Sequence, residues 1–126
     1  MNALQIIPTD VVRKLFAAVD AGDLAAVAEL VADDVHMRFG NAEPTEDKAA
    51  FFEATKTIFS SFAAIRHDIL DVWQVDAVTV VAVMDVHYTR LDGREVTLPC
   101  CNTFRLRDSA IRDYRVFVDI TPVTAP

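Results

Sequence analysis

The chain has few glycines, few cysteines and few basic side chains. Its 126 residues include three glycines, two cysteines and 12 Lys or Arg against 19 Asp or Glu, which gives a formal net charge of −7. Three glycines, each expected at a turn or a helix end, leave no glycine-rich loop to hold a nucleotide phosphate. The acidic balance argues against a nucleic-acid partner, because binding to a phosphate backbone requires a basic face.

Long hydrophobic runs are also missing. The longest mainly apolar stretch, 77–84, is too short to span a bilayer, so we expect no membrane partner. The first ten residues contain no Lys or Arg and no long apolar core, so they predict no signal peptide. A disulfide between the adjacent Cys100 and Cys101 would be strained, because neighbours on a strand point to opposite faces. We therefore expect two reduced thiols in a cytoplasmic protein.

What is present is the composition of one globular domain. Apolar residues make up 52% of the chain and charged residues 25%, which excludes a disordered or low-complexity protein. No internal repeat, Gly/Ser linker or charge run divides the sequence, so we expect a single domain over 1–126. A domain of this length buries about two thirds of its unfolded surface and needs no metal or disulfide to fold.

The first half of the chain predicts three helices. Thr9 is expected to cap the first helix, which ends at Gly22. Asp23 is expected to cap a second, short helix. A short strand at 33–40 follows, and the run Pro-Thr-Glu-Asp at 44–47 is typical of the start of a third helix.

The second half predicts long antiparallel strands, at roughly 66–75, 78–90, 95–107 and 111–120. The Asp92-Gly93 dipeptide between two of them is a strong β-hairpin signal. Helices followed by strands indicate an α+β fold, in which the helices pack on one antiparallel sheet.

Alternation along the strands separates an inner face from an outer face. On strand 78–90 the more apolar set, which includes Met84 and Tyr88, is expected to face the helices. The opposite face keeps Val81, Val83 and, from the last strand, Phe117. A half-apolar outer face is typical of a dimer surface, so we expect a homodimer through this side of the sheet.

Several short phrases occur in a characteristic order along nearly the whole chain. They are Ala-Gly-Asp at 21–23, Val-Ala-Asp-Asp-Val at 31–35, Phe-Phe at 51–52, Arg-Leu-Asp-Gly at 90–93, Thr-Leu-Pro at 97–99, Phe-Arg-Leu-Arg-Asp at 104–108 and Tyr-Arg-Val-Phe-Val-Asp at 114–119. Together they resemble the nuclear transport factor 2-like superfamily, in particular its SnoaL-like (polyketide-cyclase-like) bacterial branch. The resemblance implies a cone-shaped (cystatin-like) fold, in which a curved antiparallel sheet wraps around three N-terminal helices and encloses an apolar pocket.

The resemblance implies no single activity, because members include ketosteroid isomerases, epoxide hydrolases, dehydratases, cyclases and non-catalytic binding proteins. The positions that match the isomerase's tyrosine donor and carboxylate base are Phe16 and Phe39, which cannot do that chemistry. The positions that match the Arg/Asp pair of limonene-type epoxide hydrolases are Cys100 and Asn102, which are neutral. Asn102 could donate to a ligand or an oxyanion, or be a satisfied core amide.

We predict that the pocket binds a small hydrophobic molecule with at least one polar group. Its expected lining is Phe16, Met37, Phe39, Met84, Tyr88, Cys100, Asn102, Phe104, Tyr114 and Val118. The alternative is an acid/base enzyme: an isomerase, dehydratase, cyclase or epoxide hydrolase. A carboxylate or histidine that faces the pocket within reach of Asn102 or a tyrosine would favour the enzyme, whereas a pocket with only Asn, Tyr and Cys as polar groups would favour binding.

The histidines and the remaining acids are expected outside the pocket. Asp85 and His87 share one strand face, and a His–Asp pair is a usual general base, but alternation puts both on the outer face. His36 and His67 are expected at the surface. Asp119, near the end of the last strand, is expected to bind backbone or an arginine, and the alternative is an acid at the pocket mouth. The histidines lack metal-ligand spacing, so we expect no metal site, and nothing predicts a cofactor.

Overall fold

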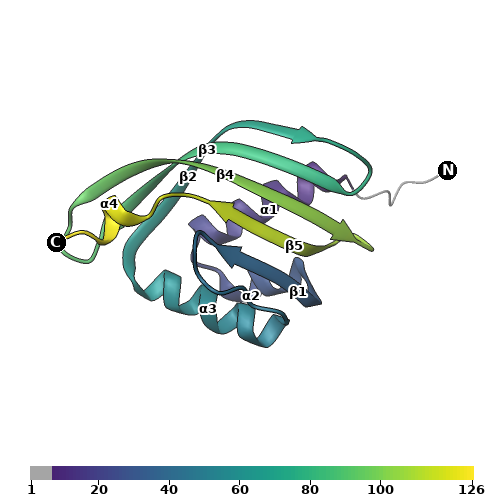
Figure 1. Cartoon of the computed structure of the whole chain (residues 1–126), viewed down its shortest axis with the longest axis horizontal. Helices are drawn as coiled ribbons and strands as arrows, with labels where there is room; N and C mark the ends of the chain where they lie inside the picture. The colour runs from purple at the N-terminus through teal and green to yellow at the C-terminus, as the bar shows by residue number, and fades with distance from the viewer. Residues whose placement is uncertain (1–6) are drawn as a thin grey trace.

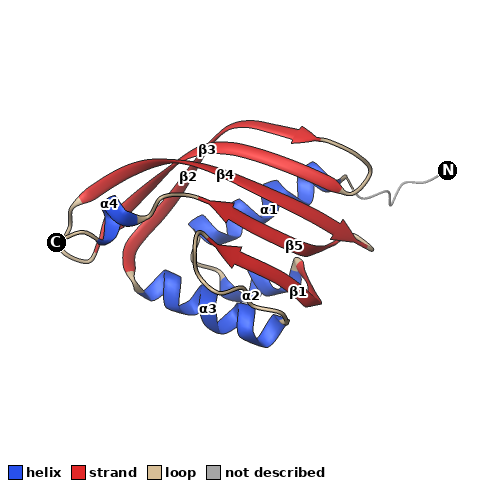
Figure 2. Cartoon of the chain, in the orientation of Figure 1, coloured by secondary structure: helices blue, strands red, loops and turns tan. Residues whose placement is uncertain are grey.

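The computed structural model describes residues 7–126. Its elements are α1 (Pro8–Asp20), α2 (Leu24–Glu29), β1 (Val31–Phe39), α3 (Lys48–Ser60), β2 (Phe62–Gln74), β3 (Thr79–Arg90), β4 (Glu95–Arg107), β5 (Ala110–Phe117) and α4 (Thr121–Thr124). Within these residues one five-stranded sheet, in the order β1-β5-β4-β3-β2, curves around α1, α2 and α3 (Figures 1 and 2). The predicted α+β fold with a curved sheet around three N-terminal helices is confirmed.

Strands β2 to β5 form an antiparallel meander, as the alternating strand and turn pattern predicts. The edge strand β1 differs from the expected antiparallel pairing, because it runs parallel to β5, with Arg38 opposite Arg115. Parallel neighbours need a long connection, and here α3 and the rest of the sheet lie between the two strands in the chain. The last strand ends at Phe117, earlier than predicted, because the chain then turns into α4.

Two helix starts differ from the sequence prediction. Helix α1 is capped by the backbone of Ile7 rather than by Thr9, because Pro8 occupies its first position. Proline suits that position, since its missing N–H would have no helical partner there. Helix α3 is capped by Asp47, whose carboxylate accepts the backbone N–H of Ala50 at 2.8 Å. Asp23 caps α2 in the same way, as predicted.

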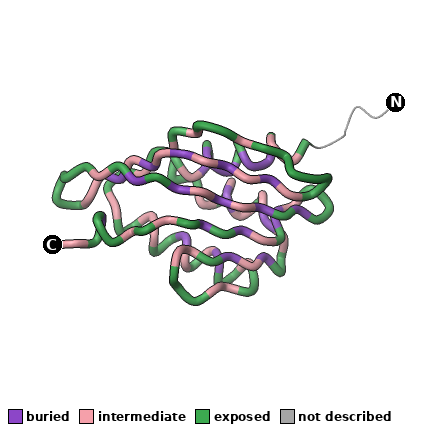
Figure 3. The backbone as a smooth tube through the Cα atoms, turned by 45° about the horizontal axis from the view of Figure 1, so that its top comes forward, coloured by how far each residue is buried: buried purple, intermediate pink, exposed green. Residues whose placement is uncertain are grey.

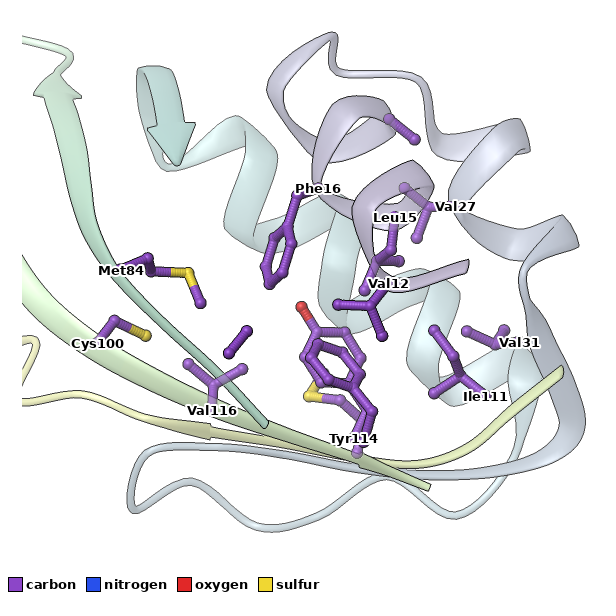
Figure 4. Packing of buried hydrophobic residues seen from close by; sticks show 14 of the residues in the cluster. Val12, Leu15, Phe16, Val27, Val31, Met84, Cys100, Ile111, Tyr114 and Val116 are labelled. Carbon is purple, nitrogen blue, oxygen red and sulfur yellow. The ribbon is translucent and has the colours of Figure 1, made fainter. Parts of the chain in front are cut away.

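The core lies between the concave face of the sheet and the helices. Burial alternates along β3, where Val80, Ala82, Met84, Val86 and Tyr88 are buried as predicted (Figure 3). Figure 4 shows side chains of α1, among them Phe16, pointing toward those of the sheet. None of the helices within 7–126 is long and apolar enough to cross a membrane.

Candidate functional site

A cavity of about 60 Å³ lies between the concave side of the sheet and helices α1 and α3. Its lining is mostly aliphatic and aromatic. The polar side chains in the lining are Thr55, His67, Tyr88, Cys100, Asn102 and Tyr114. Lining residues such as Phe39, Ile58 and Phe59 are only half-buried, so they form the mouth toward solvent. The space holds a few water molecules, and a larger ligand would have to move the mouth side chains.

Six of the ten residues expected around the pocket lie in this lining: Met37, Phe39, Tyr88, Cys100, Asn102 and Tyr114. The other four lie elsewhere. Phe16, Met84 and Phe104 are fully buried in the core and do not line the cavity, because they pack between α1 and the sheet. Val118 follows the end of β5 and lines a separate surface hollow beside Arg38.

His67 lies in the wall of the cavity, which corrects the expectation of a surface position. Its side chain is 10% exposed, and its ring packs against the ring of Phe16 at a centroid distance of 4.9 Å. The ring atom Nδ1 is 2.6 Å from Oδ1 of Asp20. The backbone N–H of His67 also donates to both carboxylate oxygens of Asp20, at 3.1 Å each. Two side chains of α1 thus hold the imidazole: Phe16 packs against the ring, and Asp20 pairs with its Nδ1 atom.

This histidine was missed because the alternation along β2 is weak. Its neighbours at two residues' distance, Ile65 and Ile69, are both packed against the core, and that spacing is a signal that His67 shares their face. A second signal is Asp20 itself, at the last residue of α1. A carboxylate at a helix C-terminus is disfavoured by the helix dipole, so an acid there indicates a specific partner.

Asn102 and Cys100 form a second polar pair on the inner face of β4. The Cys100 thiol donates to Oδ1 of Asn102 at 3.1 Å, and Asn102 is 1% exposed. Burial, with a smaller contribution from the neighbouring Cys101, raises the pKa of the Cys100 thiol to about 12. The thiol therefore keeps its proton at neutral pH and is a poor nucleophile.

Both tyrosines of the chain line the same cavity, with their rings buried. Burial, with a smaller effect of Cys100, raises the pKa of Tyr88 and of Tyr114 well above the usual range. Their hydroxyl groups therefore stay protonated and can donate hydrogen bonds.

The remaining candidates lie outside the cavity. The ring of His87 pairs with the hydroxyl of Thr97 on the outer face, at 2.8 Å, and Asp85 is on the same face of β3. Asp119 is exposed and accepts the backbone N–H of Thr121 just before α4, which matches the expected backbone role. Half-buried His36 pairs with Glu46 rather than with a cavity residue.

The arrangement can perform proton transfer. A carboxylate only accepts hydrogen bonds, so Nδ1 of His67 donates to Asp20 and Nε2 is left as the basic nitrogen. On strands β3, β4 and β5 the same cavity presents hydrogen-bond donors: the hydroxyls of Tyr88 and Tyr114 and the amide of Asn102. A base and a set of donors that line one cavity are the groups needed to remove a proton next to a carbonyl group and stabilise the oxygen anion.

A family model described as "SnoaL-like domain" matches residues 12–114. Among solved structures, a nuclear transport factor 2-like protein of unknown function from Burkholderia pseudomallei is similar, with a TM-score of 0.84 and 15% identity over 92% of this chain and 93% of the other. A proposed polyketide cyclase from Pseudomonas putida gives 0.81 and 21% identity, over 93% and 95%. TerC, co-crystallised with polyporic acid, gives 0.81 and 15%, over 92% and 94%. No curated protein matches the chain.

Proposed function

The chain belongs to the SnoaL-like domain family, and we propose that it is a proton-transfer enzyme whose cavity binds a small, largely apolar molecule with a carbonyl group. The observation that carries the proposal is His67 in the cavity wall, with Nδ1 2.6 Å from the carboxylate of Asp20. Because the family includes both enzymes and binding proteins, membership alone does not decide between them.

The proposed reaction is proton exchange next to a carbonyl group. Nε2 of His67 takes a proton from the carbon beside the carbonyl, and the electron pair of that C–H bond forms the C=C bond of an enolate. The negative charge moves to the carbonyl oxygen, where Asn102 and the tyrosine hydroxyls donate hydrogen bonds. Return of a proton from His67 to carbon completes an isomerisation or an exchange with solvent.

The lining supports a ligand of this type. Most of it is apolar, which favours a hydrophobic skeleton, and its polar groups are few. The likeness to TerC, a protein co-crystallised with polyporic acid, supports a small organic ligand for this chain. Phe59 and Ile58 at the mouth would have to move to admit a ring.

Acetophenone in D₂O provides a direct test. The protein should accelerate the replacement of the methyl protons by deuterium, which ¹H NMR follows as the loss of the methyl signal. His67→Gln should lower this rate about a hundredfold or more, because a positioned base contributes a factor of that size. His87→Gln is the matched control, since His87 lies on the outer face of the neighbouring strand and should leave the rate unchanged.

Binding without turnover is the second candidate function. It is favoured by Asn102, an amide buried to 1% exposure in the cavity wall, where a polar anchor for a ligand is expected. Acetophenone that binds with no exchange above the His67→Gln rate would contradict the enzyme and leave this binding function. Asn102→Leu should then weaken the affinity for acetophenone, and an unchanged affinity would argue against the anchor.

We also propose that the outer face of the sheet forms a homodimer. Trp73 and Phe117 are 50% and 56% exposed on this face, and Val81 and Val83 lie on the strand between β2 and β4. An exposed apolar surface of this kind is typical of an interface. Phe117→Glu should convert the dimer to a monomer in sedimentation equilibrium, whereas Leu91→Glu, at an exposed hairpin turn, should not.

Charge on the outer face supports a second copy as the occupant. Asp68 and Asp85 face each other across β2 and β3, whereas Arg38 and Arg115 face each other across β1 and β5. A two-fold axis along the strands would bring the acidic side of one copy against the basic side of the other. A monomer at all concentrations of the unmodified protein would contradict this proposal.

A further inference from the structure

Cys100 and Asn102 lie two residues apart on the inner face of β4, and the hydrogen bond between them determines which end of the amide meets the cavity. We propose that Cys100 is a positioning residue: its S–H holds Oδ1 of Asn102, so that Asn102 presents its NH₂ group to a hydrogen-bond acceptor on the ligand. The role rests on the proposed function, because it requires that the cavity bind a polar ligand.

The thiol can select the orientation of the amide because packing alone cannot. The oxygen and the NH₂ group of an asparagine have nearly the same shape, and they differ in that one accepts and the other donates. Sγ of Cys100 is 3.1 Å from Oδ1 of Asn102, and both residues are buried. A buried S–H next to the amide therefore favours the orientation in which the oxygen points at sulfur.

The thiol keeps its proton, and can therefore donate it, near neutral pH. Burial raises the pKa of Cys100 to about 12, so the thiolate, which could only accept, is a rare form near neutral pH. In this contact the thiol of Cys100 is therefore the donor and the amide oxygen of Asn102 is the acceptor.

The NH₂ group of Asn102 is open to the cavity. The Cys100 thiol is the partner of the Asn102 oxygen, and the NH₂ group makes no hydrogen bond to another described residue. Because no fully buried side-chain nitrogen or oxygen within 7–126 lacks a partner, the NH₂ nitrogen is not completely enclosed by protein. Because Asn102 lines the cavity, its NH₂ group is accessible from there. Tyr88 and Tyr114 present further donors, so the group that fits is a carbonyl or enolate oxygen rather than an N–H.

Two probes of nearly equal shape measure this preference. Acetophenone carries a carbonyl oxygen, and ethylbenzene has the same skeleton without it. The ratio of their dissociation constants, from NMR titration of the labelled protein, should favour acetophenone in the unmodified chain. Cys100→Ala should reduce that ratio about threefold to tenfold, because the amide can then turn its oxygen toward the ligand.

Cys100→Ser is the rescue variant, since its hydroxyl can donate to the same oxygen, and its ratio should stay within about twofold of the unmodified value. Asn102→Leu should abolish the preference and also identifies the side-chain amide signal of Asn102 in the ¹H–¹⁵N spectrum. That signal should move on addition of acetophenone in the unmodified chain and in Cys100→Ser, but not in Cys100→Ala.

The outcomes separate the two proposals. An equal preference in Cys100→Ala and the unmodified chain would overturn the positioning role and leave the ligand pocket standing. If neither probe binds the unmodified chain, the proposed function fails, and the positioning role fails with it. Circular dichroism shows that each variant is folded, and the amide signal of Asn102 reports on the contact even where an affinity changes for other reasons.

Discussion

His67 and His87 lie on neighbouring strands one register step apart, yet they face opposite sides of the sheet. His67 on β2 is opposite Val86, and His87 on β3 is opposite Arg66. The first ring is buried in the cavity wall against Asp20, whereas the second pairs with the hydroxyl of Thr97 on the outer face. Side chains one residue apart along a strand point to opposite faces of the sheet. Two histidines at neighbouring positions therefore lie in different environments.

The cysteines repeat the comparison within one strand. Cys100 is buried on the inner face and donates to Asn102, whereas Cys101 is opposite Val83 and Phe117 on the outer face. The inner face thus collects groups whose protonation and orientation are fixed by burial. The outer face carries half-exposed side chains that are available to a second copy of the chain.

The largest contrast between the two faces should be in stability. Phe16→Ala should lower the free energy of unfolding by about 3–5 kcal/mol, because the ring is buried between His67 and Phe104 and its removal leaves a cavity. Phe117→Ala, at a 56% exposed site, should change it by about 0.5 kcal/mol or less in dilute protein. Urea unfolding of both variants measures the difference, and comparable losses would refute the separation into core and outer face.

Thiol alkylation should separate Cys100 from Cys101. With iodoacetamide at pH 8, in protein dilute enough to be monomeric, we expect Cys101 to react at least about a hundredfold faster, because burial raises the pKa of Cys100 to about 12 and the thiolate is the reactive form. The rate at Cys100 should rise with pH as deprotonation increases. Peptide mass spectrometry measures both sites, and unfolding in urea should bring the two rates together. Equal rates in the folded protein would show that Cys100 is accessible to reagent as a thiolate.

Asp20 and Asp85 should differ in how much each contributes to the exchange rate. Asp20→Asn should slow the exchange of acetophenone protons by about tenfold to a hundredfold, because the amide no longer stabilises the protonated imidazole of His67. Asp85→Asn should leave the exchange rate unchanged, since Asp85 lies on the other face. An unchanged rate in Asp20→Asn would mean that His67 does not act as the base.

How well the sequence predicts which side chains face inward depends on how regularly apolar and polar residues alternate along each strand. The clean alternation on β3 predicted that Met84 and Tyr88 would be buried and that Asp85 and His87 would lie outside, and the structure agrees. Strand β2 alternates poorly in sequence, so its pattern does not indicate that His67 faces inward, and the structure shows a register shift in this strand between Ile69 and Asp71.

The contacts of the site depend on residues far apart in the chain. Asp20 and His67 are 47 positions apart, and only the packing of α1 on β2 brings them together. The parallel pairing of β1 with β5 is equally non-local. Local patterns predict the elements and their faces, whereas the meeting of two faces depends on tertiary packing.

The smallest effect concerns the acids of the outer face. Asp68 and Asp85 are directly opposite each other on antiparallel strands, a position in which like charges are destabilising. Asp85→Asn should therefore raise the stability of dilute protein by about 0.2–1 kcal/mol at low salt, and by less in 1 M NaCl, where the repulsion is screened. Asp71→Asn is the control, because Asp71 is opposite Val83. At concentrations where the homodimer forms, Asp85→Asn should lose stability, because the proposed two-fold axis brings Asp85 toward the basic side of the other copy. No gain of stability in dilute protein would show that the two acids do not repel each other measurably within one copy.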